Sequence, residues 1–206
     1  MSDPAITLYG TELSGHAHRV VLLLRMLGLP YRFVAAPVEV RRSEDFLKLN
    51  PLGQIPVLQD GSLTLADSNA IMVYLVKRYE PGSAWLPEEP VAASQVQRWL
   101  SIAAGEVMYG TAISRGIAQW NAPWDRKIAE RISERLLRFM DGHLAGRTYL
   151  AAGHPTIADL ACYSYVAHAP EGGISLDPYP AVRAWLRRIE GLPHFVPMPK
   201  SPLPQA

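Results

Sequence analysis

Two short polar segments contain residue types that could hold one end of a small peptide. The first reads Gly53, Gln54, Ile55, Pro56, and the proline lies where an apolar strand begins. Proline has no amide hydrogen, so it can open a strand but cannot lie within the ladder of hydrogen bonds. A cis Ile55-Pro56 bond would turn the backbone of Ile55 outward. Its N–H and C=O are then expected to be free to pair with an extended peptide.

The second segment is Asp67-Ser68, which follows an apolar strand at 63–66 and precedes an apolar run of helical period at 70–75. This position predicts a helix N-terminus. Free N–H groups and a partial positive charge at such a terminus suit a carboxylate, whereas the Asp67 side chain suits an ammonium group. Together they describe a site for the amino-acid end of a peptide. The alternative is that the pair only caps the helix.

The elements that must position these residues change in style near residue 80. Before it, β-rich runs at 6–9 and 31–34 enclose a helical period, which predicts a β-α-β unit followed by a hairpin and a further helix. The predicted organisation is an α+β N-terminal domain at 1–80, a linker rich in Pro, Gly and acidic residues at 81–90, and an all-α domain at 91–206. Helices of the second domain are predicted at 91–119, 124–144, 156–168 and 179–189.

In these residues the chain resembles the glutathione transferase family, whose first domain is thioredoxin-like. The resemblance implies that Ile55 pairs with the cysteinyl backbone of glutathione and that Pro56 is the family's cis-proline. It also implies that Asp67 and Ser68 hold the γ-glutamyl end, with Gln54 as a neighbouring polar contact. The family usually has Glu where this chain has Asp67, which is one methylene shorter.

A capping box extends the resemblance into the second half of the chain. In Thr156-Ile157-Ala158-Asp159, the threonine is predicted to cap a helix while Asp159 reaches back to the cap. The family carries a Thr-x-x-Asp cap in its central C-terminal helix. Asp159 is therefore interpreted as a structural residue.

A glutathione enzyme must form the thiolate of its cosubstrate. The free thiol has a pKa near ~8.5, and lowering it by about two units requires roughly 2.7 kcal/mol of preferential stabilisation of the anion. A hydroxyl beside a helix N-terminus can supply much of this. By its distance from Arg19 and Val20, Ser14 resembles the activating residue of the serine-type classes. Thr11 and Tyr9 are alternatives, and His16 is a second candidate reactive group.

The electrophile pocket is expected between the domains. Met108 and Tyr109 are the first candidates for its wall, followed by Trp120, and core packing or a subunit contact is the alternative for each. An apolar, aromatic pocket suits a hydrophobic electrophile without identifying it.

Composition excludes several other classes. The chain has 206 residues, of which 49% are hydrophobic and 19% charged, and its net charge of +1 gives no electrostatic case for binding nucleic acid or an anionic membrane. Neither a membrane-spanning segment nor a signal peptide is expected. The single cysteine, Cys162, excludes an internal disulfide framework, fits a cytoplasmic location and is interpreted as a core residue. His16 and His18 lack the companions of a metal site.

The predicted function is therefore that of a cytoplasmic, homodimeric glutathione transferase, which activates the thiol of reduced glutathione for attack on a hydrophobic electrophile. Glutathione is a cosubstrate, and no further cofactor is expected. By resemblance the subtype could be a dehalogenase, an etherase or an isomerase. The alternative is a non-catalytic binding or regulatory module of the same fold.

Overall fold

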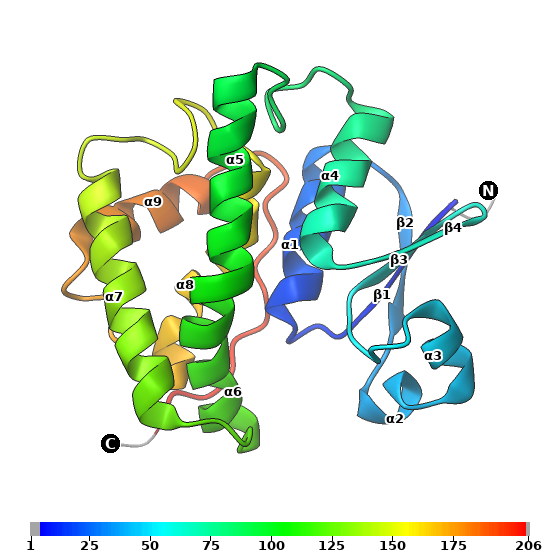
Figure 1. The fold of residues 1–206 in the computed structure, drawn as a ribbon, viewed down its shortest axis with the longest axis horizontal. Coiled ribbons are helices and arrows are strands. Elements are labelled where there is room, and N and C mark those ends of the chain that lie inside the picture. The colour runs from blue at the N-terminus through cyan, green and yellow to red at the C-terminus, as the bar shows by residue number, and fades with distance from the viewer. Residues whose placement is uncertain (1–4, 205–206) are drawn as a thin grey trace.

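The N-terminal half is built on a four-stranded mixed sheet. A computed structural model describes residues 5–204, and Figure 1 shows its fold. The strand order is β2 (Tyr31–Ala35), β1 (Ile6–Gly10), β3 (Val57–Asp60), β4 (Leu63–Ala66). Strand β1 runs parallel to β2 and antiparallel to β3, which pairs antiparallel with β4. The predicted β-α-β unit, hairpin and following helix are confirmed, and the fold of this half is thioredoxin-like.

Alternation along the strands directs side chains to the two faces of the sheet. Ile6 and Leu8 of β1 face the main core, together with residues of α1 (Gly15–Met26) and α4 (Ser68–Tyr79). Tyr9 faces the opposite side, where Phe46 of α3 (Glu44–Leu49) is buried. Figure 1 shows α1 and α4 on one side of the sheet, and α3 on the other with α2 (Val38–Arg41). These two short helices were not predicted from the sequence.

The rest of the chain is helical. Its elements are α5 (Pro90–Ile102), η1 (Ala103–Ala112), α6 (Ile113–Trp120), α7 (Arg126–Leu144), α8 (Ile157–Ala167), η2 (Ala169–Gly172) and α9 (Pro180–Glu190). The segment predicted to be helical at 91–119 is helical throughout, and its middle part, η1, is a π-helix. Gly110 of η1 lies so close to α7 that an added Cβ would be 3.0 Å from the backbone nitrogen of Ser133. This close approach is a tertiary contact that hydrophobic periodicity does not encode.

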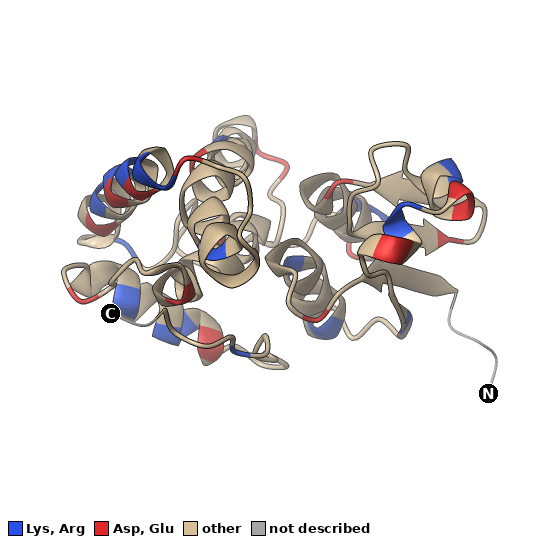
Figure 2. Ribbon diagram, turned by 90° about the horizontal axis from the view of Figure 1, so that it is seen from below, with Lys and Arg blue, Asp and Glu red and all other residues tan. Residues whose placement is uncertain are grey.

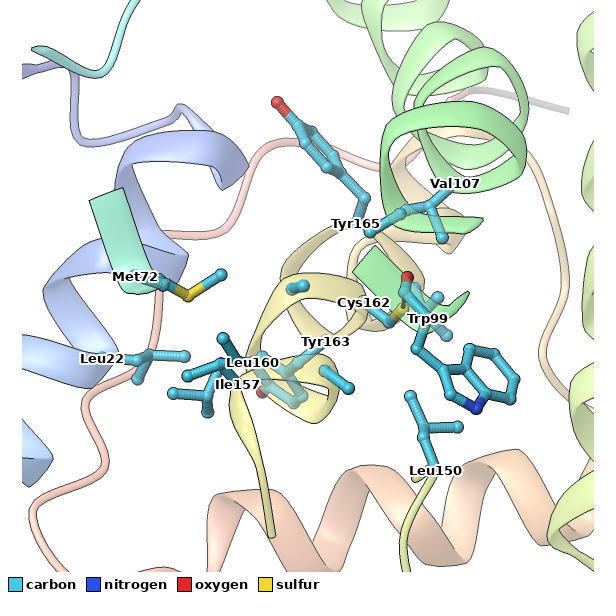
Figure 3. Close-up of a cluster of buried hydrophobic side chains, with 14 of the residues drawn as sticks. Leu22, Met72, Trp99, Val107, Leu150, Ile157, Leu160, Cys162, Tyr163 and Tyr165 are labelled. Carbon is cyan, nitrogen blue, oxygen red and sulfur yellow. Dashed lines mark hydrogen bonds between the residues drawn. The ribbon is translucent and has the colours of Figure 1, made fainter. Parts of the chain in front are cut away.

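Helix α8 is the centre of the core. It packs against α1, α5 and η1, and most of its residues are fully buried. Figure 3 shows Leu160, Cys162 and Tyr163 of α8 surrounded by apolar side chains, including Leu22 of α1 and Trp99 of α5. The prediction that Cys162 is a core residue is confirmed, and burial raises the pKa of its thiol to about 12. The two halves of the chain therefore share one core.

The predicted capping box is present at the start of α8. Thr156 Oγ1 accepts a hydrogen bond from the Ala158 amide at 3.2 Å, and Asp159 Oδ2 accepts one from the Thr156 amide at 2.9 Å. The other carboxylate oxygen, Oδ1, accepts hydrogen bonds from the Leu150 amide and from Trp185 Nε1, both at 2.9 Å. Asp159 is fully buried. Its carboxylate connects three segments of the helical half, those that contain Leu150, Thr156 and Trp185.

The end of the chain, from Val196 on, is rich in proline. As far as residue 204, it is a strap without regular secondary structure, and Figure 1 shows it passing close to α1 and reaching α6. His18 on α1 joins it, with Nε2 2.8 Å from the Val196 carbonyl oxygen and Nδ1 2.9 Å from Ser164 Oγ. Within the strap, Met198 is buried. Residues 205 and 206 of the same tail lie outside the described range.

Charged residues of both signs are interspersed along the helices, as Figure 2 shows. Between residues 5 and 204 no helix is both long and apolar enough to cross a membrane.

Candidate functional site

Ser14 is the N-cap of α1. Its Oγ accepts a hydrogen bond from the Ala17 amide at 3.3 Å, and its backbone is extended, as a cap requires. Since the oxygen is used as an acceptor, the hydroxyl hydrogen is free to be donated. The partial positive charge of a twelve-residue helix begins at this position. Ser14 therefore combines a free donor with a helix terminus, the two features that stabilise a thiolate.

The alternative candidates in the same loop are placed differently. The Tyr9 hydroxyl donates to Gln59 Oε1 at 2.8 Å, and its ring packs edge-on against Phe46 on the far face of the sheet. Thr11 is partly exposed, and its carbonyl oxygen accepts the Ser14 amide at 3.0 Å. This geometry favours Ser14 over Tyr9 as the hydroxyl at the start of α1, and Thr11 supports the turn that precedes it.

His16 lies in the first turn of α1, beside residues of the helical half. Its Nε2 is 3.3 Å from the sulfur of Met108, and its ring packs edge-on against Tyr165 with centroids 4.9 Å apart. Burial, and to a smaller extent the charge of Arg19, lowers the pKa of His16 to about 3. The imidazole is therefore neutral at physiological pH. His18 has separate partners, Ser164 and Val196, so the two histidines do not converge on one ligand.

Tyr165 of α8 is a site residue that the sequence analysis missed. An added Cβ on Gly15 would be 2.8 Å from its ring, so only glycine permits this approach between α1 and α8. Burial raises the pKa of the phenol, while the charges of Arg19 and Arg115 act in the opposite direction. Figure 3 shows the hydroxyl directed away from the apolar cluster. A protonated phenol packed against Gly15, the residue after Ser14, supplies a second potential donor. No signal in the helical pattern of α8 distinguished it from a core tyrosine.

The Ile55-Pro56 peptide bond is cis, and the proline is buried. Ile55 is partly exposed and Gln54 is exposed. The backbone N–H and C=O of Ile55 form no hydrogen bond with any residue of the described chain, 5–204. The structure therefore presents the free backbone pair that the sequence led us to expect at this position.

Asp67 is the N-cap of α4, and its Oδ1 accepts the amides of Asn69 and Ala70, both at 2.9 Å. Its backbone has φ of 72°, a left-handed conformation that costs a non-glycine residue on the order of 1–3 kcal/mol and is common at ligand sites. The side chain is exposed, whereas that of Ser68 is buried. Capping accounts for one carboxylate oxygen of Asp67 and leaves the other at the surface.

Arg19 connects helix α1, which begins after Ser14, with the N-terminus of α4 at Asp67 and Ser68. Its guanidinium is buried between α1 and α4, and Nη1 donates to Ser68 Oγ at 3.3 Å and to Asn69 Oδ1 at 3.2 Å. Its Nε and Nη2 have no partner among the residues that the structure describes. Burial lowers the pKa of Arg19. A positive charge in a medium of low dielectric favours anions bound at either helix terminus.

The three residues predicted for the electrophile pocket lie on the helical half in different environments. Met108 contacts His16, as described above. Tyr109 is 48% exposed and packs edge-on against Trp124, whereas Trp120 is 54% exposed and lies over the guanidinium of Arg115 at 5.0 Å. Of the three, Met108 thus contacts the first turn of α1. A role for any of the three in binding an electrophile stays a prediction.

Within residues 5–204, no group of three or more His, Cys, Asp or Glu side chains is arranged to hold a metal ion.

The fold and the site together define a class of protein. A thioredoxin-like domain with a free backbone edge at a cis-proline is followed by an all-helical domain that packs against the loop carrying Ser14.

Comparison with known proteins identifies the family within this class. Residues 8–84 match the model of the glutathione S-transferase N-terminal domain, and residues 121–193 match that of the C-terminal domain. The chain is 31% identical to a probable glutathione S-transferase, GSTF1, from Oryza sativa subsp. japonica, over 91% of this chain and 92% of the rice protein.

Solved structures agree with this identification. A glutathione S-transferase from Pseudomonas fluorescens superimposes with a TM-score of 0.87 at 33% identity, covering 94% of this chain and 98% of that one. A theta-class enzyme from Xanthomonas axonopodis pv. citri, solved with glutathione bound, gives 0.83 at 27% identity, covering 93% and 95%. The chain belongs to the glutathione S-transferase family, a family of enzymes.

Proposed function

We propose that this enzyme binds reduced glutathione across the segments described above and adds its sulfur to a hydrophobic electrophile. The backbone of Ile55 pairs with the cysteinyl part of glutathione, and Asp67 and Ser68 hold the γ-glutamyl end, with Gln54 nearby. The observation that carries this proposal is the donor left free on Ser14 at the start of α1, in a helix that Arg19 ties to Ser68. A relative solved with glutathione bound, the theta-class enzyme from Xanthomonas axonopodis pv. citri, supports the choice of ligand.

The chemistry requires little more than a stabilised anion. The S–H bond of glutathione breaks and its proton leaves to solvent, while the Ser14 hydroxyl donates to the sulfur. The thiolate then forms a bond to carbon, and either a leaving group departs or the adduct takes up a proton. His16 is neutral and serves as a second polar contact, and Met108 forms part of the electrophile pocket with Tyr109 and Trp120. Glutathione is the cosubstrate, no further cofactor takes part, and the enzyme acts in the cytoplasm.

An ultraviolet difference titration of the protein with glutathione tests this function. A bound thiolate that forms well below the pKa of the free thiol, near ~8.5, is the expected result. Binding without that shift would replace the transferase by a non-catalytic binding module of the same fold, and absence of binding would remove glutathione as the ligand.

Asp67→Asn is expected to weaken glutathione binding about tenfold, since it removes the charge that attracts the ammonium group, an effect of about 1.4 kcal/mol. Asparagine caps helices as well as aspartate does, and it tolerates positive φ. The melting temperature should therefore stay close to that of the wild type. Calorimetric titration with glutathione measures the affinity. Unchanged affinity would reduce Asp67 to a helix cap.

We also expect a homodimer in solution, with α4 and α5 at the interface. A cavity of about 510 Å³ lies between these helices, lined by Val73 and Lys77 of α4 and by Ala93 and Gln97 of α5, among others. Val73→Arg should convert the dimer to a monomer, because a charge would be buried without a partner. Light scattering measures the molar mass of the wild type and of Val73→Arg in solution. A wild-type monomer, or a variant that remains dimeric, would rule out this interface.

A further inference from the structure

Arg115 of α6 is a buried cation that connects four separate parts of the chain. Its Nε forms an ion pair with Glu171 Oε2 of η2 at 2.6 Å, and both side chains are at least 95% buried. Its Nη1 donates to the carbonyl oxygen of Leu13 at 2.7 Å, and its Nη2 donates to Ser201 Oγ in the C-terminal strap at 3.0 Å. None of these partners lies within 50 residues of Arg115 along the chain.

Glu171 holds the other side of this cluster. Its Oε1 accepts the amide of Ser201 at 3.0 Å and lies 2.6 Å from His168 Nδ1. Burial acts to raise the pKa of Glu171, but the hydrogen bonds from Arg115, Ser201 and His168 hold it below its ordinary value. The strap is attached once more where Gln119 Nε2 donates to the Pro202 carbonyl oxygen at 2.8 Å. Three residues of α6 and η2 thus clamp the strap.

The contact with Leu13 reaches the proposed thiol site. The peptide unit between Leu13 and Ser14 has its carbonyl oxygen bonded to Arg115 and its N–H bonded to the Thr11 carbonyl oxygen, at 2.7 and 3.0 Å. With both polar groups held, this peptide plane cannot rotate without breaking a hydrogen bond. Its orientation determines where the Ser14 hydroxyl points, and a hydroxyl must be correctly placed to stabilise a thiolate.

We propose that Arg115, held by Glu171 and the C-terminal strap, is a positioning residue for thiol activation by Ser14. The proposal rests on the proposed function. Arg115 acts through the Leu13-Ser14 peptide, and the strap contributes through Ser201. Its removal is expected to impair thiolate formation and turnover more than glutathione affinity, because Ile55 and Asp67 are not part of the cluster.

Two variants test this role. Arg115→Lys keeps the charge opposite Glu171 but cannot donate to three partners at once. A chain ending at Lys200 removes both Ser201 contacts and leaves Arg115 in place. Each is expected to raise the pKa of bound glutathione by at least about half a unit and to lower kcat about threefold or more, with less change in the dissociation constant of glutathione. Should Arg115→Lys fail to fold, the shortened chain provides the same comparison.

The matched control is Arg188→Lys. Arg188 also donates to backbone carbonyls, those of Thr148 and Arg147 at 3.1 and 3.4 Å, but it does so on the helical half between α9 and the 147–148 segment. Its substitution should leave the thiol pKa and kcat unchanged. If folded Arg115→Lys and the shortened chain both retain the wild-type thiol pKa and kcat, the cluster is merely structural and the proposal is overturned.

Hydrogen–deuterium exchange separates this outcome from failure of the proposed function. Faster exchange at residues 11–17 in Arg115→Lys, relative to Arg188→Lys, is expected if Arg115 holds the loop. If the wild type forms no thiolate, the proposed function fails. Unchanged exchange at residues 11–17 in Arg115→Lys would in that case also refute the role of Arg115 in holding the loop. A thiolate in the wild type with no effect of either variant refutes the positioning role alone.

Discussion

Ser14→Ala is expected to raise the pKa of bound glutathione by about one to two units and to lower kcat about 100-fold, with a smaller loss of glutathione affinity. The hydroxyl is the donor that the geometry leaves free at the start of α1, since its oxygen already accepts the Ala17 amide. Without it, the helix terminus and the more distant charge of Arg19 are the remaining stabilisers of the thiolate. The pH dependence of thiolate absorbance and of kcat measures the effect.

Two control variants separate activation from helix capping. Ser43→Ala removes a cap in which Oγ likewise accepts a backbone amide, that of Phe46 at 3.3 Å, on the short helix α3. The Ser43 Oγ also donates to the Val40 carbonyl oxygen at 2.7 Å. The substitution should cost a similar stability, about 1 kcal/mol, without changing the thiol pKa. Ser14→Asp keeps a cap but places a negative charge, with no donor, beside the sulfur, so the thiol pKa should rise at least as far as in the alanine variant.

The proposed role of Ser14 would be rejected if alanine left both the thiol pKa and kcat at wild-type values. Tyr165, whose ring packs against Gly15 next to Ser14 and whose phenol is protonated, would then become the first candidate donor, followed by His16 and Thr11.

Asp159→Ala is expected to lower the free energy of unfolding by about 3–5 kcal/mol. The carboxylate accepts hydrogen bonds from three donors besides its capping contact with the Thr156 amide: the Leu150 amide, Trp185 Nε1 and Thr156 Oγ1. All lie in the interior, where an unsatisfied donor costs about 1–3 kcal/mol. Burial raises the pKa of this carboxyl, so its hydrogen bonds offset a desolvation penalty that alanine would not carry.

Urea denaturation followed by circular dichroism measures this loss. Asp125→Ala is the matched control, since Asp125 is an exposed N-cap at the start of α7 whose side chain accepts the Ile128 amide at 3.0 Å. Its loss should cost about 1 kcal/mol. Equal effects of the two substitutions would mean that Asp159 acts as a simple cap and that its links to Leu150 and Trp185 contribute little.

The sequence by itself determined the features that are encoded within a few consecutive residues. The strand before Asp67, the helix after it, the opening of β3 at Pro56 and the capping box at Thr156 were all predicted, because φ restriction, missing donors and side-chain caps act locally. The order of a β-rich half followed by a helical half was predicted from hydrophobic periodicity, which is also a local property of the sequence. Residues 53–56 and 67–68 were therefore found as a candidate site before their spatial relation was known.

Only the tertiary structure decided which distant residues join that site. The side of the sheet that Tyr9 faces, the approach of Tyr165 to Gly15, and the π-helical turn of η1 beside α7 depend on how helices pack against one another. Arg115 shows the reason most clearly. A buried arginine is stable only where partners satisfy its charge and its donors, and here they come from residues 13, 171 and 201, which no local pattern brings together.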